Sequence, residues 1–105
     1  SVNRQHIEVA GDGRLRDAGV SIACIALHDA RVPALAALAA RTVDALPGLN
    51  GYVGIDLVWH RERGPVAIEV NPRLTCSYAG LSSALGRNLA AEIVTAHLEA
   101  VHATA

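Results

Sequence analysis

Hydrophobic and polar positions along the chain change period several times, and each change predicts a new element. Short alternating runs predict strands, whereas apolar residues three and four positions apart predict helices. The pattern predicts two strands, a helix, two more strands and a final helix. Their expected ranges are 2–9, 15–27, 32–46, the paired strands within 50–71, and 82–102. This ββαββα order predicts an α+β fold, an antiparallel β-sheet with two helices packed against one face.

Turn residues and apolar stripes support these boundaries. Gly11-Asp-Gly13 predicts a hairpin turn between the first two strands. Residues 20–27 are nearly all apolar, which predicts a strand covered on both faces. Pro33 is acceptable in the first turn of the first helix, and Pro47-Gly48 ends it. The predicted apolar stripes are Leu35, Leu38, Thr42 and Leu46 on the first helix, and Leu85, Leu89, Ile93 and Ala96 on the second.

The register of the hairpin within 50–71 decides which side chains share a face. A loop of two residues or of four gives one register, in which Asp56 lies opposite Glu69 and apolar residues meet apolar residues. A three-residue loop would shift the pairing by one and set apolar residues against polar ones, so we reject it. The predicted apolar pairs are Ile55 with Val70, Leu57 with Ile68, and Trp59 with Val66.

Polar side chains gather on the other face of this hairpin. Directly opposed residues have Cβ atoms about 5 Å apart, so Asp56 opposite Glu69 requires a cation or a basic side chain between them. Asn71 follows on the same face and adds a neutral oxygen, while Gly54 leaves room. Because these hard oxygen donors suit Mg²⁺ or Mn²⁺ better than zinc, the face is predicted to be a metal site of Asp56, Glu69 and Asn71.

The same residues carry a family resemblance. Gly-x-Asp on one strand and Glu-x-Asn-Pro-Arg on the next resemble the C-terminal part of an ATP-grasp domain of the carboxylate-amine ligase type. The Asn-Pro-Arg-Leu-Thr-x-Ser-Tyr form looks most like the branch that includes tyramine-glutamate ligases. The resemblance implies that Asp56, Glu69 and Asn71 hold magnesium ions that bridge the phosphates of ATP. It also implies the C-terminal subdomain of an ATP-grasp fold.

The resemblance extends into the loop expected at 72–80. It implies that Arg73 lies near the transferred phosphate or the acyl substrate as a catalytic residue. It also implies that Asn71, Thr75 and Ser77 contact the nucleotide. Ser and Thr also stabilise loops by bonding their own backbone, so a purely structural role for Thr75 and Ser77 stays open.

The sequence is therefore compatible with two functions. In the first, the parent protein uses ATP as co-substrate to join a small-molecule carboxylate to an amine or thiol through an acylphosphate. In the second, the chain is a noncatalytic metal-binding or subunit-interaction domain with an ATP-grasp-like fold. The chain has no lysine with which to hold phosphates, so residues 1–105 are expected to be a fragment that is inactive alone. The remaining N-terminal subdomains are its expected partners.

Composition narrows the picture further. A net charge of −1 and 51% hydrophobic residues indicate neither a nucleic-acid partner nor disorder. The apolar runs are too short to span a bilayer, so no membrane contact is expected. Cys24 and Cys76 make no disulfide framework, which favours a cytoplasmic protein. An apolar face left uncovered could also allow a homo-oligomer.

Overall fold

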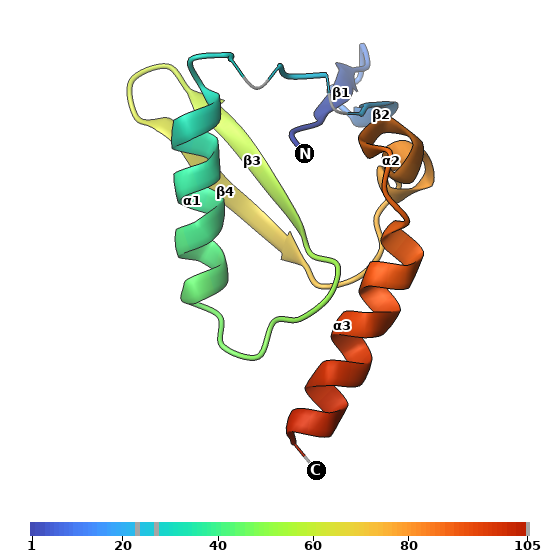
Figure 1. Ribbon diagram of the computed structural model, residues 1–105. Helices are drawn as coiled ribbons and strands as arrows, with labels where there is room; N and C mark the ends of the chain where they lie inside the picture. Colours follow the sequence, from blue (N-terminus) through green and yellow to red (C-terminus); the bar gives the residue numbers. More distant parts are fainter. Residues whose placement is uncertain (23, 27, 105) are drawn as a thin grey trace.

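The computed structural model describes residues 1–22, 24–26 and 28–104. Over these ranges the chain forms four strands and three helices, and the α+β class is confirmed (Figure 1). The strands and helices are β1 (Arg4–Val9), β2 (Leu15–Ser21), α1 (Val32–Asp44), β3 (Gly54–His60), β4 (Gly64–Asn71), α2 (Tyr78–Leu85) and α3 (Leu89–Ala103). The prediction of a single sheet is wrong, because the described strands form two separate antiparallel pairs, β1–β2 and β3–β4.

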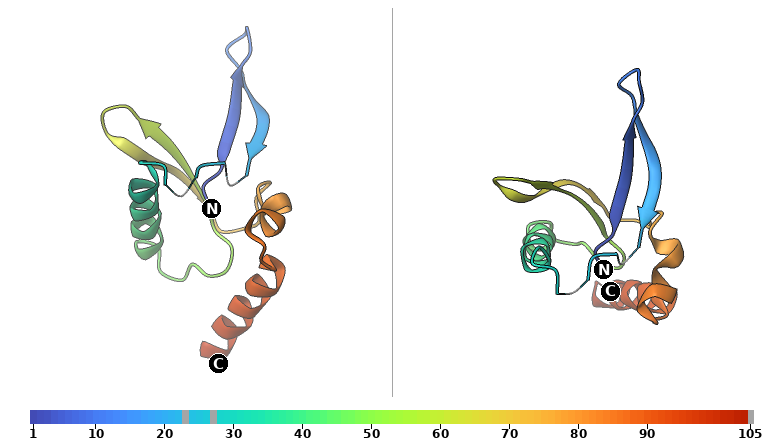
Figure 2. Two further views of the ribbon diagram at one scale, coloured as in Figure 1. Left: turned by 45° about the horizontal axis from the view of Figure 1, so that its top comes forward. Right: turned by 90° about the horizontal axis from the view of Figure 1, so that it is seen from above.

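The β1–β2 hairpin extends away from the other elements (Figure 2). Its predicted turn is confirmed: Gly13 has φ of 80°, and its amide donates to the carbonyl oxygen of Ala10. Every residue of β1 and the first five of β2 are exposed. Val9 and Leu15, which pair with each other, keep 71% and 73% of their surface in contact with solvent. Pairing between its own strands, rather than packing, therefore holds most of this hairpin.

The second strand is shorter than predicted. β2 ends at Ser21, and residues 22, 24, 25 and 26 lie outside any strand. Residues 23 and 27 of the expected strand lie outside the described residues. Ser21 already pairs with Arg4, the first residue of β1, so the apolar run beyond it has no strand with which to bond. The prediction of a strand covered on both faces is therefore wrong for the described residues beyond Ser21.

Helix α1 lies against the β3–β4 hairpin (Figure 1). Its start agrees with the prediction, Pro33 stands in its first turn, and it ends at Asp44. Leu35 is buried at 8% exposure, and the Thr42 hydroxyl donates to the carbonyl oxygen of Leu38 at 2.8 Å. Leu46 follows the helix and is 41% exposed, so the apolar stripe ends one turn earlier than predicted.

The β3–β4 hairpin contains both registers, one in each half. Asp56 lies opposite Glu69 and Ile55 opposite Val70, as predicted. Beyond Asp56 the ladder shifts by one residue, and the hairpin closes through three residues, 61–63. The rejection of a three-residue loop is therefore wrong for the outer half, and so are two predicted apolar pairs. The observed pairs there are Leu57 with Ala67, Val58 with Val66, and Trp59 with Pro65.

A β-bulge at Ile68 joins the two registers. A three-residue loop alone would set Asp56 against Ile68. Ile68 instead falls between Ala67 and Glu69 without a place in the ladder, and it is 64% exposed. Gly64 closes the loop with φ of 73°, the left-handed conformation that a three-residue hairpin loop requires. The bulge is thus what brings Glu69 opposite Asp56.

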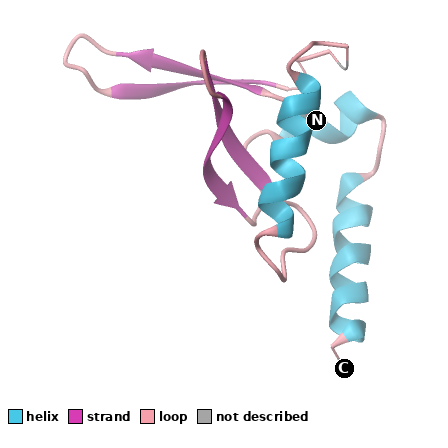
Figure 3. Cartoon of the chain, turned by 90° about the vertical axis from the view of Figure 1, so that its left-hand side faces the viewer, coloured by secondary structure: helices cyan, strands magenta, loops and turns pink. Residues whose placement is uncertain are grey.

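The long helix expected over 82–102 is divided in two (Figure 3). It begins earlier than predicted, at Tyr78, and the preceding loop is correspondingly shorter. Gly86 has φ of 64°, and the amides of Gly86 and Arg87 donate to the carbonyl oxygens of Ser83 and Ser82. This pair of bonds is a Schellman motif, which ends α2. Asn88 then caps α3 by accepting from the amide of Ala91.

The described part of the chain is open. Its radius of gyration is 15.6 Å, against about 13 Å for a compact domain of this length. Its accessible surface is 7,702 Å², against about 5,600 Å² for a compact monomer of this mass. The buried apolar residues are Leu35, Leu81 and Leu89. None of the helices has the length and apolarity that crossing a membrane requires, over the residues that could be searched.

Candidate functional site

The carboxylates and the amide predicted to bind metal meet at the inner end of the β3–β4 hairpin. Asp56 lies opposite Glu69, and Gly54 lies opposite Asn71. The Asn71 side chain is 9% exposed, and its Nδ2 atom is 3.4 Å from Oδ2 of Asp56, a long hydrogen bond. Both carboxylate residues are exposed. The structure therefore brings together Asp56, Glu69 and Asn71 on one face.

Neither carboxylate forms an ion pair within the described chain. The ion pairs found there join Arg14 to Asp12, Arg31 to Asp29, and Arg87 to Glu92, so none involves this site. Like charges directly opposite each other on paired strands repel. The donor set therefore fits a hard cation, provided that the Asn71 amide turns its oxygen toward the ion. No three His, Cys, Asp or Glu side chains gather among the residues searched, so other ligands would have to complete the coordination.

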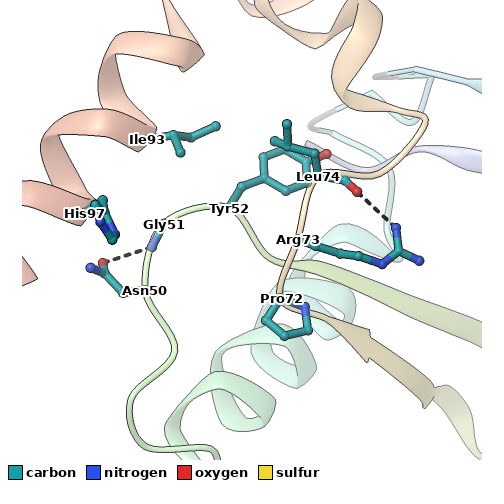
Figure 4. Close-up of a pocket in the computed structure, with 8 residues that line it drawn as sticks. All are labelled: Asn50, Gly51, Tyr52, Pro72, Arg73, Leu74, Ile93 and His97. Carbon is teal, nitrogen blue, oxygen red and sulfur yellow. Dashed lines mark hydrogen bonds between the residues drawn. The ribbon is translucent and has the colours of Figure 1, made fainter.

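Arg73 lies just after β4 but does not neutralise the carboxylates. Its Nη1 atom donates to the carbonyl oxygen of Leu74 at 3.0 Å, and its amide donates to the carbonyl oxygen of Asn71. Figure 4 shows its guanidinium directed away from α3, with His97 and Ile93 on the opposite side. The side chain is exposed. It is thus available to an external anion.

Thr75 and Ser77 form a hydroxyl cluster next to the inner end of the hairpin. The Thr75 Oγ1 atom is 2.9 Å from Oγ of Ser77 and 3.1 Å from the hydroxyl of Tyr52. The Tyr52 ring also packs edge-on against Tyr78, with centroids 5.7 Å apart. A Cβ atom on Gly54 would lie 2.8 Å from Cγ2 of Thr75. Glycine at this position therefore lets the loop approach the site face closely.

The bulge brings Val66 to this face, opposite Val58, and sequence reasoning missed this apolar pair. Val58 points to the same side as Asp56 because it lies two positions along β3, and Val66 lies opposite Val58. Val58 is 55% exposed. The predicted register placed Val66 on the opposite face with Trp59. Gly64 after three polar residues was the sequence signal for a three-residue loop, and it would have identified this apolar pair.

An open cleft of about 280 Å³ lies beside the same loop (Figure 4). It separates the loop after β4 from α3. Apolar and polar groups alternate around it: Asn50, Gly51, Tyr52, Pro72, Arg73, Leu74, Ile93 and His97. Asn50, in the segment before β3, bonds to α3, because its Nδ2 atom donates to the carbonyl oxygen of Ala96 at 2.7 Å. None of these residues except Arg73 was among the predicted site residues.

Comparison with known proteins identifies the class. The sequence model of the ATP-grasp domain matches residues 1–77, so the chain belongs to the ATP-grasp domain family, whose members bind ATP. The family resemblance inferred from the motifs is therefore confirmed. Tyramine–L-glutamate ligase of Methanocaldococcus jannaschii is 42% identical over 45 residues. That match covers 43% of this chain and 14% of the ligase. No solved structure matches the chain significantly.

Proposed function

We propose that these residues form the magnesium-binding and ATP-binding part of a ligase that joins a carboxylate to an amine or thiol. The observation that carries the proposal is the pair of Asp56 and Glu69, opposed without a basic partner and flanked by Asn71, in a chain of the ATP-grasp family. Magnesium held by these three residues would neutralise phosphate charge. The similarity to a ligase that joins tyramine to L-glutamate supports an amine as acceptor and an amino-acid carboxylate as substrate.

The proposed reaction has two steps. A carboxylate oxygen of the substrate attacks the γ-phosphorus of ATP, an O–P bond forms, the bond to the β-phosphate oxygen breaks, and ADP leaves. The amine then attacks the acyl carbon, a C–N bond forms, and phosphate leaves as the nitrogen loses a proton. Arg73 supports both steps in this proposal, because a guanidinium can bind a phosphoryl or acylphosphate oxygen through two donors.

Other groups around the carboxylate face have roles in the same proposal. The pair of exposed Val58 and half-buried Val66 lies beside the carboxylates and suits an apolar part of the ligand, such as the purine base. Thr75 and Ser77, along with Asn71, contact the nucleotide. The cleft between Leu74 and α3 is the candidate entry for the acyl substrate or the amine. The exposed free thiols of Cys24 and Cys76 support a reducing cytoplasm as the place of action.

Further residues of the protein have to complete the nucleotide site. The chain has no lysine, and its open surface exceeds that of a compact monomer by about 2,000 Å². We propose that N-terminal subdomains of the same protein cover this surface and supply the missing phosphate ligands. Residues 1–105 would then be a C-terminal ATP-grasp subdomain that does not turn over ATP alone.

The open surface also favours a second candidate function. In it the domain is noncatalytic and uses its exposed apolar residues to bind another subunit or a second copy of itself. Val94, Leu98 and Val101, each about half exposed, lie along α3 at helical spacing and could form such a surface. This candidate predicts association without ATP turnover.

A substrate panel tests the leading proposal. The full-length protein is incubated with ATP, Mg²⁺, a set of carboxylic acids and a set of amines, and ADP and phosphate are measured. We expect ADP release that depends on both an acid and an amine. Release of AMP and pyrophosphate would contradict the acylphosphate route, and absence of turnover with self-association would favour the second candidate.

Matched glutamate variants test the site itself. Glu69→Ala should abolish turnover, because it removes one of the two metal-binding carboxylates. Glu62→Ala removes a carboxylate from the exposed turn of the same hairpin and should leave turnover unchanged. Substantial activity in Glu69→Ala, with an unchanged fold, would rule out the assignment.

A further inference from the structure

Three hydroxyl groups stand in series between β3 and α2. The Tyr52 hydroxyl bonds Thr75 Oγ1 at 3.1 Å, and Thr75 Oγ1 bonds Ser77 Oγ at 2.9 Å. All three residues are half-buried. Tyr52 precedes β3, whereas the other two lie in the loop after β4, so the series joins segments 23 residues apart in sequence.

Counting protons gives this series a direction. Each hydroxyl carries one hydrogen, and two bonds among three hydroxyls use two of them, so one proton is left for a further partner. The phenol of Tyr52 is more acidic than an aliphatic hydroxyl and is therefore the better donor to Thr75. With Tyr52 as donor, the arrangement in which Thr75 passes its own proton to Ser77 leaves the proton of Ser77 free, and this arrangement is the one proposed below.

Ser77 occupies a position where serine ordinarily bonds its own helix. It is the N-cap residue of α2, yet its side chain makes no cap hydrogen bond. Serine at an N-cap typically stabilises a helix by about 1 kcal/mol through that bond. The hydroxyl is engaged with Thr75 instead, so the helix does not fix its orientation and Thr75 does.

The series ends beside the proposed ATP site. Cγ2 of Thr75 lies 2.8 Å from the place of a Cβ on Gly54, and Gly54 is paired with Asn71. Gly54 also shares a face with Asp56, two positions along β3. Thr75 and Ser77 are thus at the Asn71 end of the carboxylate face.

We propose that Tyr52 is a positioning residue, which orients Thr75 so that Ser77 donates its proton to an anionic oxygen of a ligand beside Asn71. In the function proposed above, on which this inference rests, that oxygen belongs to a phosphate of ATP. Gly54 is the companion feature, because any side chain there would push Thr75 away from the face.

A pair of tyrosine variants tests the inference in the full-length protein. Affinity for a non-hydrolysable ATP analogue is measured by calorimetry with Mg²⁺ present. Tyr52→Phe should weaken binding about fivefold, the usual effect of one hydrogen bond. Tyr78→Phe removes the other hydroxyl of the same ring pair, one that makes no hydrogen bond with the described residues, and should leave affinity unchanged.

A double variant separates positioning from simple stabilisation. If Tyr52 acts through Ser77, Tyr52→Phe combined with Ser77→Ala should bind no more weakly than Ser77→Ala alone. Additive losses, or a lower melting temperature with unchanged affinity in Tyr52→Phe, would overturn the inference. Asp56→Asn distinguishes the two proposals: loss of binding there with none in Tyr52→Phe refutes the positioning role alone. Unchanged binding in Asp56→Asn refutes the proposed function and with it this inference.

Discussion

The two hairpins of the chain share their local chemistry and differ in what covers them. Each is an antiparallel pair with an irregular register, between Gln5 and Ile7 in one and between Asp56 and Leu57 in the other. Each has a glycine with positive φ at its turn, Gly13 or Gly64. Of the two, β3–β4 packs along a helix, α1, and carries the candidate site.

This difference shows what a binding face requires beyond its ligands. In β3–β4, Ile55, Leu57 and Val70 are half-buried and form the face opposite to Asp56. The packing of α1 against the hairpin fixes the register, because a slip by one residue would turn these apolar side chains toward solvent. The β1–β2 hairpin has no comparable buried set, so nothing except its own ladder and turn fixes its register. Backing by α1 is therefore the condition for holding Asp56 opposite Glu69.

The largest expected effect is the loss of this backing. Leu35→Ala truncates the most buried apolar residue of α1 and should lower the free energy of unfolding by about 2–5 kcal/mol. Val9→Ala, in the exposed hairpin, should change it by less than about 0.5 kcal/mol. Urea unfolding of both variants measures the contrast. Equal losses would show that the two hairpins are equally integrated in the fold.

Crowding of the site face should have the next largest effect. Gly54→Ala places a Cβ 2.8 Å from Thr75 Cγ2, so the loop has to move, at a cost of about 1–3 kcal/mol. Gly11→Ala in the other hairpin meets no atom within 4 Å and serves as the matched control. Thermal unfolding compares the two, and a neutral Gly54→Ala would show that the loop yields without cost.

Sequence patterns predicted the parts of the fold that local chemistry determines. The turn at 11–13, the start of α1 at Val32 and the opposition of Asp56 and Glu69 were all correct. The break at Gly86 could have been predicted from the sequence, because glycine is typical of a helix end and Asn88, two residues later, is typical of the N-cap of a new helix. The prediction of one helix was wrong because the apolar spacing of Leu85, Leu89 and Ile93 continues across the break.

The errors arose where two local rules had to be combined or where pairing was long-range. The prediction assumed one register along the whole hairpin, which paired Trp59 with Val66 and excluded a three-residue loop. The bulge at Ile68 shifts the register by one residue, so a three-residue loop and the opposition of Asp56 and Glu69 occur together. The apolar run after Ser21 matched a buried strand, but strand formation needs a partner, and β1 begins only at Arg4, which already pairs with Ser21. The role of Tyr52 depends on a contact with Thr75 that no spacing rule contains.

Turn glycines offer a more subtle comparison. Gly64 and Gly13 have φ of 73° and 80°, so alanine at either position is strained by about 1 kcal/mol. The consequences should differ, because only β3–β4 packs on α1. Gly64→Ala should reduce amide hydrogen-exchange protection in both β4 and α1, whereas Gly13→Ala should reduce it in β1 and β2 alone. Reduced protection of α1 in Gly13→Ala would contradict the independence of the exposed hairpin.

The smallest expected effect concerns the segment that joins the two hairpins, where Asp29 precedes α1. Hydrogen bonds from the Arg31 side chain and amide hold the pKa of the Asp29 carboxyl well below its usual range. The folded state therefore binds this proton less readily than the unfolded state, whose aspartate pKa is about 3.9. The resulting stability is fully present above about pH 4 and is lost as pH falls further.

Melting temperatures of Asp29→Asn should consequently decline less steeply below about pH 4 than those of the wild type. The difference should be small, because solvent screens this accessible pair, and Glu92, whose pKa Arg87 lowers, retains its own pH dependence in both proteins. Identical slopes would show that the Asp29–Arg31 contact does not anchor the start of α1, and the covered hairpin would then depend on packing alone.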